Sequence, residues 1–425
     1  MKLYEYPGKE VWEEIIQRPA ADYSSLEKSV KKILQKVKDK GDKAVRKFTK
    51  EFDGVSLKKL WVTEKAISGA ASLLSDGLKQ AIQQAKNNIE AFHVAQKEEV
   101  KKIETMPGVV CWRQSAGIEK VGLYIPGGSA PLFSTVLMLA VPACIAGCKE
   151  IILCSPPAKD GSINPAILYA AQLCGIKKII KAGGVQAIGG MAYGTETIPK
   201  VFKIFGPGNQ YVTLAKQLIQ QEGVAIDMPA GPSEVLVIAD ETSIPEFVAA
   251  DLLSQAEHGP DSQVILITTS AAIATQTKAA VLQQVNLLPR KDIAVKALQH
   301  SKLVVVKNLD EAMQLSNLYA PEHLIIACAD VLTISQQVIA AGSVFLGNYS
   351  PESVGDYASG TNHTLPTNGY AAMYSGVSVD SFVKKITYQQ LTKEGLQQIG
   401  NTVMEMASAE GLDAHRNAVA IRLKN

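Results

Sequence analysis

The fold is decided by residues 235–268, which read VLVIADETSIPEFVAADLLSQAEHGPDSQVILIT. Two runs rich in β-branched residues, Val235–Ala239 and Gln263–Thr268, flank a segment whose apolar residues recur with a helical period. A strand, a helix and a second strand in succession predict a βαβ unit, in which the two strands are parallel.

The helix of this unit carries two polar residues near its end. Pro245 fits the first helical turn, Ser243 with Glu246 matches a capping box, and a Gly-Pro pair supplies the stop. Gln255 and His258 are three residues apart, so they share one helical face and can converge on one point. The pair is a candidate half-site for zinc. Taken alone, it is explained better by a histidine that the helix dipole favours and a surface glutamine, since glutamine is an uncommon zinc ligand.

Further strands alternate with helices on both sides of this unit. A first series begins near residue 118 and a second at Val235, which predicts an α/β fold with two parallel sheets. Residues 24–105 read as amphipathic helices, and the charged tail from Thr387 to Asn425 reads as helices that dock on another subunit. The expected strands are Lys120–Ile125, Glu150–Cys154, Lys178–Lys181, Lys200–Phe205, Val235–Ala239, Gln263–Thr268, Lys302–Val306, Leu324–Ala327 and Ser343–Leu346.

The composition excludes several classes of protein. The chain has 425 residues, of which 47% are hydrophobic and 20% charged, and its formal net charge is +2. We therefore expect two or more domains and no field that attracts nucleic acid or a membrane surface. The uncharged run 130–148 contains two prolines and leads into a strand, which favours a buried helix over a membrane span. Six cysteines without a Cys-x-x-Cys pair, and no signal peptide, indicate free thiols and a cytoplasmic protein.

Four glycine-rich loops follow strands of the first series. They read YIPGGS at 124–129, AGGVQ at 182–186, FGPGNQY at 205–211 and PAGPSE at 229–234. In open α/β sheets, ligands bind at the carboxyl ends of the strands, where glycine lets backbone N–H groups approach a phosphate. A nucleotide site fits this pattern, although simple tight turns explain the glycines about equally well. There is no G-x-G-x-x-G motif, so NAD would bind without the usual fingerprint.

Ligand-type residues gather in three further places. Glu322 and His323 enter the strand that begins at Leu324, ESVGDYASGTNH occupies 352–363, and EGLDAH occupies 410–415. The charged pair Glu322-His323 can be a plain surface feature. Adjacent Glu and His also provide two acid–base groups of different pKa, which suits a reaction with more than one proton transfer. A zinc shell of nitrogen and oxygen ligands is available from Gln255, His258, Asp356 and His415.

Several of these stretches resemble, in order, the signature of the histidinol dehydrogenase family. They are YIPGG at 124–128, FGPGN at 205–209, DMPAGPSEVLVIAD at 227–240 followed by DLLSQAEH at 251–258, APEH at 320–323 and SGTNH at 359–363. The resemblance covers essentially the whole chain. It implies a homodimeric enzyme that oxidises L-histidinol to L-histidine through an aldehyde, with two NAD and one zinc ion per subunit.

The resemblance also implies a role for each site residue. His323 removes the hydroxyl proton in both hydride transfers, and Glu322 activates the water that attacks the aldehyde. Zinc holds the imidazole and the amine of the substrate. The implied zinc ligands are Gln255, His258, Asp356 and, across the dimer, His415; the implied NAD contacts are Tyr124, Gln186 and Asn209; the implied substrate contacts are Ser233, Gln255, His258, His323, Asp356, His363, Glu410 and His415.

The family's architecture implies two incomplete Rossmann-like units, with small helical extensions that pack on the partner subunit. On this chain we expect a helical extension over 1–21, a larger unit made of 22–123 and 237–377, and an inserted NAD-binding unit over 124–236. The tail 378–425 would complete the active site of the partner.

Three other functions compete with this interpretation. A zinc hydrolase would use Glu322 to activate water on the metal, and would leave the glycine loops without a role. An aldehyde dehydrogenase would need a nucleophilic cysteine in a polar loop, and the sequence contains none. A non-catalytic relative would have no need for the complete set of acid–base and ligand residues.

Overall fold

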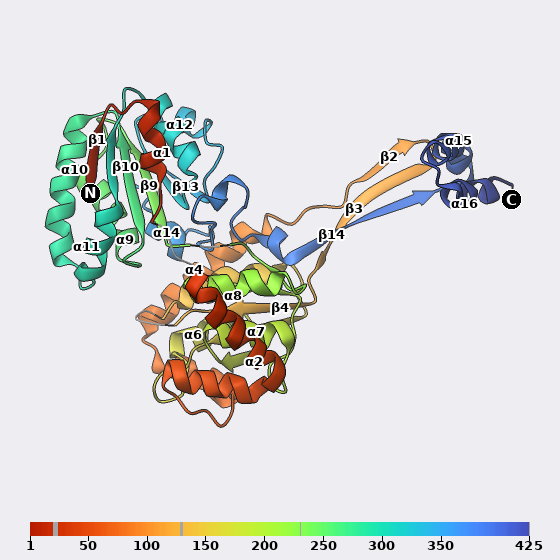
Figure 1. The fold of residues 1–425 in the computed structure, drawn as a ribbon, viewed down its shortest axis with the longest axis horizontal. Coiled ribbons are helices and arrows are strands. Elements are labelled where there is room, and N and C mark those ends of the chain that lie inside the picture. The colour runs from red at the N-terminus through yellow and green to blue at the C-terminus, as the bar shows by residue number, and fades with distance from the viewer. Residues whose placement is uncertain (20–23, 128–130, 230, 425) are drawn as a thin grey trace.

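The chain folds into two parallel-sheet units, from which an antiparallel ribbon projects (Figure 1). The computed structural model describes residues 1–19, 24–127, 131–229 and 231–424. Both sheets are entirely parallel, which confirms the expected α/β class. Within the described ranges, no helix is long and apolar enough to cross a membrane.

The larger sheet has six strands, and every residue of β9 and β10 is buried. Such continuous apolar runs are typical of parallel strands that are covered on both faces. Helices α9 (Pro245–Ala256), α10 (Ala271–Gln284) and α11 (Lys291–His300) cover one face, and α1 (Trp12–Ile16) and α12 (Leu309–Tyr319) cover the other. In spatial order the strands are β1 (Lys2–Glu5), β11 (Lys302–Val305), β10 (Gln263–Thr268), β9 (Glu234–Ala239), β12 (His323–Ala327) and β13 (Ser343–Leu346).

The smaller sheet has five strands with helices on both faces. On one face, α5 (Phe133–Ile145) is buried along almost its whole length, as expected for the uncharged run. The helices on this face are α3 (Glu64–Gly69), α4 (Asp76–Val94), α5 and α6 (Pro165–Leu173), and those on the other are α2 (Ser24–Phe48), α7 (Gly184–Tyr193) and α8 (Gln210–Gln220). In spatial order the strands are β6 (Lys178–Lys181), β5 (Glu150–Ser155), β4 (Lys120–Tyr124), β7 (Lys203–Phe205) and β8 (Ala225–Ile226).

The packing divides the chain differently from the expected boundaries. We expected residues 22–123 to join the larger unit, but the apolar face of α2, which includes Val30 and Val37, lies in the core that α7 and α8 share. Strand β4 is the central strand of the smaller sheet, so a boundary at 123/124 would cut a strand. By packing, the elements from α2 to β8 belong to the smaller sheet, apart from residues 102–117, which form part of the ribbon. The expected boundary at 21/22 lies outside the described residues.

The N-terminal extension also differs from expectation. Its first residues form β1, which pairs in parallel with β11 of the same chain, and α1 packs on the same sheet. The extension is therefore a strand and a short helix that complete their own subunit's sheet. The capping box expected for α9 is wrong, because the Ser243 hydroxyl donates to the carbonyl of Asp240 and the helix begins after Ile244 without a side-chain cap.

The ribbon consists of three antiparallel strands that the sequence did not predict. β3 (Val109–Gly117) pairs with β2 (Lys102–Met106) on one side and with β14 (Val383–Leu391) on the other. Helices α15 (Lys393–Ala409) and α16 (Asp413–Lys424) follow at its far end, away from both sheets (Figure 1). Residues 387–391 of the tail, which we expected to be helical, therefore belong to the nine-residue strand β14.

Candidate functional site

Two adjoining cavities contain most of the candidate residues. The smaller has a volume of about 240 Å³ and the larger about 1130 Å³, and Pro126 and Asn209 line both. The larger cavity contains Tyr124, Gln186 and Asn209. The smaller contains Ser233, Gln255, His258, Glu322, His323, Asp356 and His363.

The smaller cavity lies at the amino end of the larger sheet, where β9 and β12 begin. Glu322 and His323 enter β12 and are both buried. The backbone N–H of Glu234, the first residue of β9, donates to Glu322 Oε2 at 2.9 Å. The carbonyl of Glu234 lies 3.1 Å from His323 Nδ1. One residue of the neighbouring strand therefore holds both candidate acid–base groups.

The second ring nitrogen of His323 faces the cavity. Nε2 lies 3.2 Å from Asp356 Oδ1, on α14 (Glu352–Tyr357). Burial disfavours the imidazolium, but the charge of Glu322 and the hydrogen bond to Asp356 outweigh it, and the pKa of His323 is raised well above its ordinary value. Since a carbonyl only accepts hydrogen bonds, Nδ1 carries a proton and Nε2 is the nitrogen that exchanges one.

The candidate metal ligands Gln255, His258 and Asp356 line this cavity together. Because α9 runs back along the sheet after β9, its last turn returns to the amino end and delivers Gln255 there. The Gln255 Oε1 atom is buried and has no hydrogen-bond partner. Within the described part of the chain, no three His, Cys, Asp or Glu side chains form a metal-sized group. The set within one subunit is one imidazole, one carboxylate and one amide.

His363 connects the two units across the cavity. Its Nδ1 atom lies 2.8 Å from the backbone carbonyl of Asp356, and its Nε2 atom lies 3.0 Å from Oγ1 of Thr135 on α5. Burial lowers the pKa of His363, so the neutral ring is favoured. A neutral imidazole that is held at both nitrogens is a fixed wall of the cavity.

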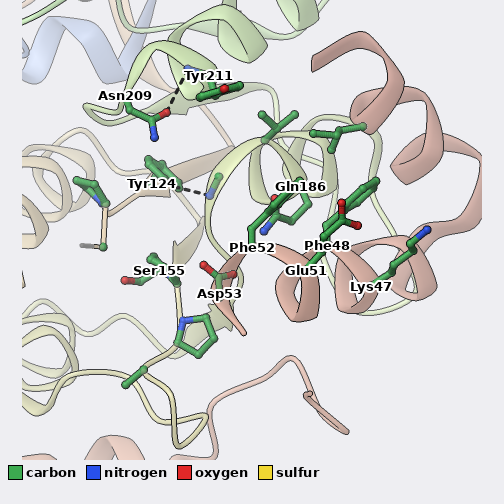
Figure 2. A pocket seen from close by; sticks show the side chains of 18 of the residues that line it. Lys47, Phe48, Glu51, Phe52, Asp53, Tyr124, Ser155, Gln186, Asn209 and Tyr211 are labelled. Carbon is green, nitrogen blue, oxygen red and sulfur yellow. Dashed lines mark hydrogen bonds between the residues drawn. The ribbon is translucent and has the colours of Figure 1, made fainter. Parts of the chain in front are cut away.

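The larger cavity lies at the carboxyl end of the smaller sheet. Tyr124 ends β4, and its hydroxyl accepts from the N–H of Gly184 at 3.1 Å. Gln186 is buried on α7, and its Oε1 atom has no hydrogen-bond partner. Asn209 caps α8 and accepts from the N–H of Tyr211 at 3.1 Å (Figure 2). The dipole of this helix start favours an anionic group.

The glycine loop between the cavities is held in place by the side chains of Asp227 and Lys216. Gly206 adopts a φ of +128°, and a Cβ atom there would lie 2.1 Å from the Tyr124 carbonyl oxygen. Its N–H donates to Asp227 Oδ2 at 2.8 Å, and its carbonyl accepts from Lys216 Nζ at 2.9 Å. Glycine is thus required here by backbone conformation and by contact. Gly128, Ser129 and Ala230 of the other predicted loops lie outside the described residues.

Two candidate residues are not brought to either cavity. Glu410 is the C-cap residue that follows α15 and His415 lies in the first turn of α16, and both are exposed. Figure 1 shows these helices at the far end of the ribbon. Within a single subunit, the structure therefore assembles all the candidate site residues except these two.

The sequence alone missed several residues of the site. Asp53 and Phe52 line the larger cavity from the π-helical segment that follows α2, a region which we had grouped with the other sheet (Figure 2). Burial raises the pKa of Asp53 to about 6, and its Oδ2 atom has no hydrogen-bond partner. Thr135 and Glu234 were likewise given no role from the sequence. Neither a motif nor a spacing marks Phe52, Asp53 or Thr135, and Glu234 lies in the PAGPSE loop without a feature that singles it out, because the importance of all four comes from contacts distant in sequence.

Comparison with known proteins identifies the family. The family model described as histidinol dehydrogenase matches residues 16–423. The histidinol dehydrogenase of Bacteroides thetaiotaomicron is 61% identical over 423 residues, which cover 100% of this chain and 99% of that protein. That of Escherichia coli K12 is 52% identical, with 96% and 94% covered. The crystal structure of histidinol dehydrogenase from Elizabethkingia anophelis has a TM-score of 0.98 at 58% identity, with 100% and 98% covered. The chain therefore belongs to the histidinol dehydrogenase family.

Proposed function

We propose that this chain oxidises L-histidinol to L-histidine with two NAD and a bound zinc ion. The observation that carries this proposal is the junction of the two cavities at Pro126 and Asn209. A buried acid–base pair, Glu322 and His323, lies in one cavity, and a space large enough for a dinucleotide opens from it. Hydride transfer requires this adjacency of substrate and cofactor.

The chemistry needs two oxidations with a hydration between them. In the first, the alcohol loses its hydroxyl proton and a hydride, which gives the aldehyde. Water then adds to the aldehyde, the hydrate loses a proton and a second hydride to give the carboxylic acid, and the acid releases one further proton to give the carboxylate. NAD, when bound, accepts each hydride.

His323 is suited to take the hydroxyl proton in both oxidations. The Glu234 carbonyl keeps the proton on Nδ1, so Nε2 is the basic nitrogen and faces the cavity. Asp356 serves either His323 or a bound cation. If a cation were bound and held this carboxylate, Nε2 of His323 would be free to accept a proton. Glu322, held by the Glu234 N–H, takes the proton of the attacking water.

The donor set fits zinc. Gln255 Oε1 is a buried oxygen without a partner, and His258 and Asp356 add nitrogen and carboxylate ligands of the kind that zinc accepts. When bound, zinc would hold the imidazole and amine of the substrate, so the aldehyde stays in place between the oxidations. Ser233 and His363 line the same cavity and would contact the substrate.

The larger cavity would hold NAD through Tyr124, Gln186 and Asn209. The unpartnered Gln186 Oε1 atom and the start of α8 provide an acceptor and a region of positive potential. A thiol mechanism is not supported, because all six cysteines are among the described residues and none lines either cavity. All six are free thiols, which agrees with our proposal of a cytoplasmic enzyme.

A second subunit would complete the site. We propose a homodimer in which Glu410 and His415 of each tail reach the smaller cavity of the other subunit. Support comes from the projecting ribbon and from α16, which buries none of its described side chains within the subunit. Apolar residues exposed on the ribbon and tail are Ile103, Ile386, Tyr388, Met406, Leu412 and Ile421.

The direct test is the amount of NADH formed per histidinol consumed by the purified protein. We expect two NADH per histidinol, loss of activity on chelation, and recovery on addition of zinc. Bound zinc with no NADH formed would instead indicate the hydrolase chemistry.

A further inference from the structure

The backbone of Glu234 holds the acid–base pair Glu322 and His323. The side chain of Glu234 is itself a carboxylate that is almost fully buried. The backbone of Glu234 contacts both Glu322 and His323, while its side chain is only 3% exposed. A carboxylate this deeply buried is stable only with a partner, since its desolvation cost is high. Its partner therefore controls the conformation of the residue on which both acid–base groups depend.

That partner is Arg18. Its Nε atom donates to Glu234 Oε1 at 2.6 Å and its Nη2 atom to Glu234 Oε2 at 3.0 Å, a bidentate arrangement. The N–H of Asn368 donates to the same Oε1 at 3.0 Å. Bidentate charge-assisted bonds fix orientation as well as distance. Arg18 is not among the described residues that line either cavity.

Arg18 is itself firmly placed. Its guanidinium carbon lies 3.9 Å from the ring centroid of Tyr319, and Nη2 also donates to the Tyr319 carbonyl at 2.5 Å. The preceding residue is fixed through its carbonyl, which accepts from Lys302 Nζ at 2.8 Å and from Gln263 Nε2 at 3.2 Å. These contacts hold the segment after α1 so that the guanidinium of Arg18 faces the carboxylate of Glu234.

We propose that Arg18 is a positioning residue of the reaction, acting through Glu234 on Glu322 and His323. It locks the side chain of Glu234, and the backbone N–H and carbonyl of Glu234 then set the carboxylate of Glu322 and the tautomer of His323. A hydrogen-bond partner behind a catalytic group commonly has this effect. This inference rests on the proposed function. It gives the N-terminal extension, which carries Arg18, a role in the reaction.

The test compares Arg18→Ala and Arg18→Lys with Arg46→Ala. Arg46 is a matched control, because it pairs at 3.0 Å with the buried Asp42 in the unit of the smaller sheet. We expect Arg18→Ala to lower kcat by about 10- to 100-fold with zinc content unchanged. KM for histidinol should change by less than about threefold, since substrate binding is retained. Arg18→Lys keeps the charge without the fork and should recover part of kcat; it is also the variant to use if Arg18→Ala does not fold.

A double substitution separates positioning from general stabilisation. In a His323→Ala background, Arg18→Ala should lower the residual rate by a smaller factor than it lowers kcat in the wild-type background, because one of the two groups through which it acts is gone. Full multiplicative losses, or a normal kcat in Arg18→Ala and Arg18→Lys, would overturn the proposal.

A crystal structure of Arg18→Ala gives a readout that does not depend on activity. We expect the bond between Glu234 and His323 Nδ1 to be broken or reoriented, and finding both Glu234 backbone bonds intact would contradict the proposal. If the wild-type chain formed no NADH from histidinol, the proposed function would fail, while this structural result would still decide whether Arg18 positions the pair.

Discussion

The two sheets present their candidate residues at opposite ends. In the smaller sheet, Tyr124 is the last residue of β4 and Asn209 follows β7, at the carboxyl end where open α/β sheets usually bind ligands. In the larger sheet, Glu234 and His323 are the first residues of β9 and β12, so the acid–base pair lies at the amino end. The two ends face each other across the shared residues of the cavities.

The acid–base pair of the smaller cavity and two residues of the larger cavity also differ in how their polar atoms are satisfied. At the amino end, Glu322 and His323 are held by bonds to Glu234 that exist without any ligand. At the carboxyl end, Gln186 Oε1 and Asp53 Oδ2 have no hydrogen-bond partner. Preorganised groups suit proton transfer, and unpartnered ones suit the recognition of a cofactor that comes and goes.

His323→Ala should have the largest effect on kcat. It should also show whether the amino end of the larger sheet and the carboxyl end of the smaller sheet act independently. Loss of the base is expected to lower kcat by about 10²- to 10⁴-fold. Zinc content and the Kd for NAD should remain near wild type, as measured by metal analysis and calorimetry. A comparable loss of NAD affinity would mean that the two ends are not independent.

Gly206→Ala should weaken NAD binding at the carboxyl end of the smaller sheet. The new methyl group would meet the Tyr124 carbonyl oxygen at 2.1 Å, so the loop must move. We expect NAD affinity to fall by at least about tenfold, since a loop shift of this kind misplaces several contacts. Gly223→Ala is the control, because Gly223 also has a positive φ of +91° but no atom within 4 Å of the added carbon. Equal effects of the two substitutions on NAD affinity would assign the loss to backbone strain instead of contact.

Gln186→Ala should have a smaller and more selective effect. Removing one hydrogen-bonding group costs about 1 kcal/mol, so KM for NAD should rise by about five- to tenfold while kcat and KM for histidinol stay unchanged. The exposed Gln172 serves as the control substitution. An unchanged KM for NAD would remove Gln186 from the cofactor site.

Asp53→Asn should give the smallest effect, one that depends on pH. The folded state raises the pKa of Asp53 from 3.8 to about 6, so this carboxyl group stabilises the fold most at low pH and loses that contribution as the pH rises from about 4 to 6. Above pH 6 the substitution removes a desolvated charge. We expect the Tm at pH 8 to rise by about 1–3 °C relative to wild type, and the difference to vanish near pH 4. A difference that is constant with pH would show that titration is not its cause.

The larger part of the parallel fold could be predicted from the sequence. β6, β10 and β13 begin and end where expected, because short β-branched runs bounded by polar or turn residues leave few alternatives. The ribbon was missed, since its strands are mostly exposed and bury little apolar surface within the subunit. The partner of α2 was assigned to the wrong sheet, because an amphipathic stripe does not specify the surface that it will cover.

The candidate site, like the fold, could be predicted only in part from the sequence. Seven candidate side chains that line the smaller cavity lie in the predicted motifs, from Ser233 to His363. They did not identify Arg18 or Asp53, whose significance depends on contacts with segments distant in sequence. Glu410 and His415 show the opposite case, in which the sequence marks the residues but the structure brings neither of them to a cavity of its own subunit.

The most direct measurement is the activity of a heterodimer made from His323→Ala and His415→Ala subunits, co-expressed with two different tags. Each homodimer should be nearly inactive. If His415 of the partner subunit completes each cavity, the heterodimer contains one intact site and should recover about half of the wild-type rate per dimer. A heterodimer as inactive as its parents would contradict the shared site, since both of its cavities would then lack an essential group.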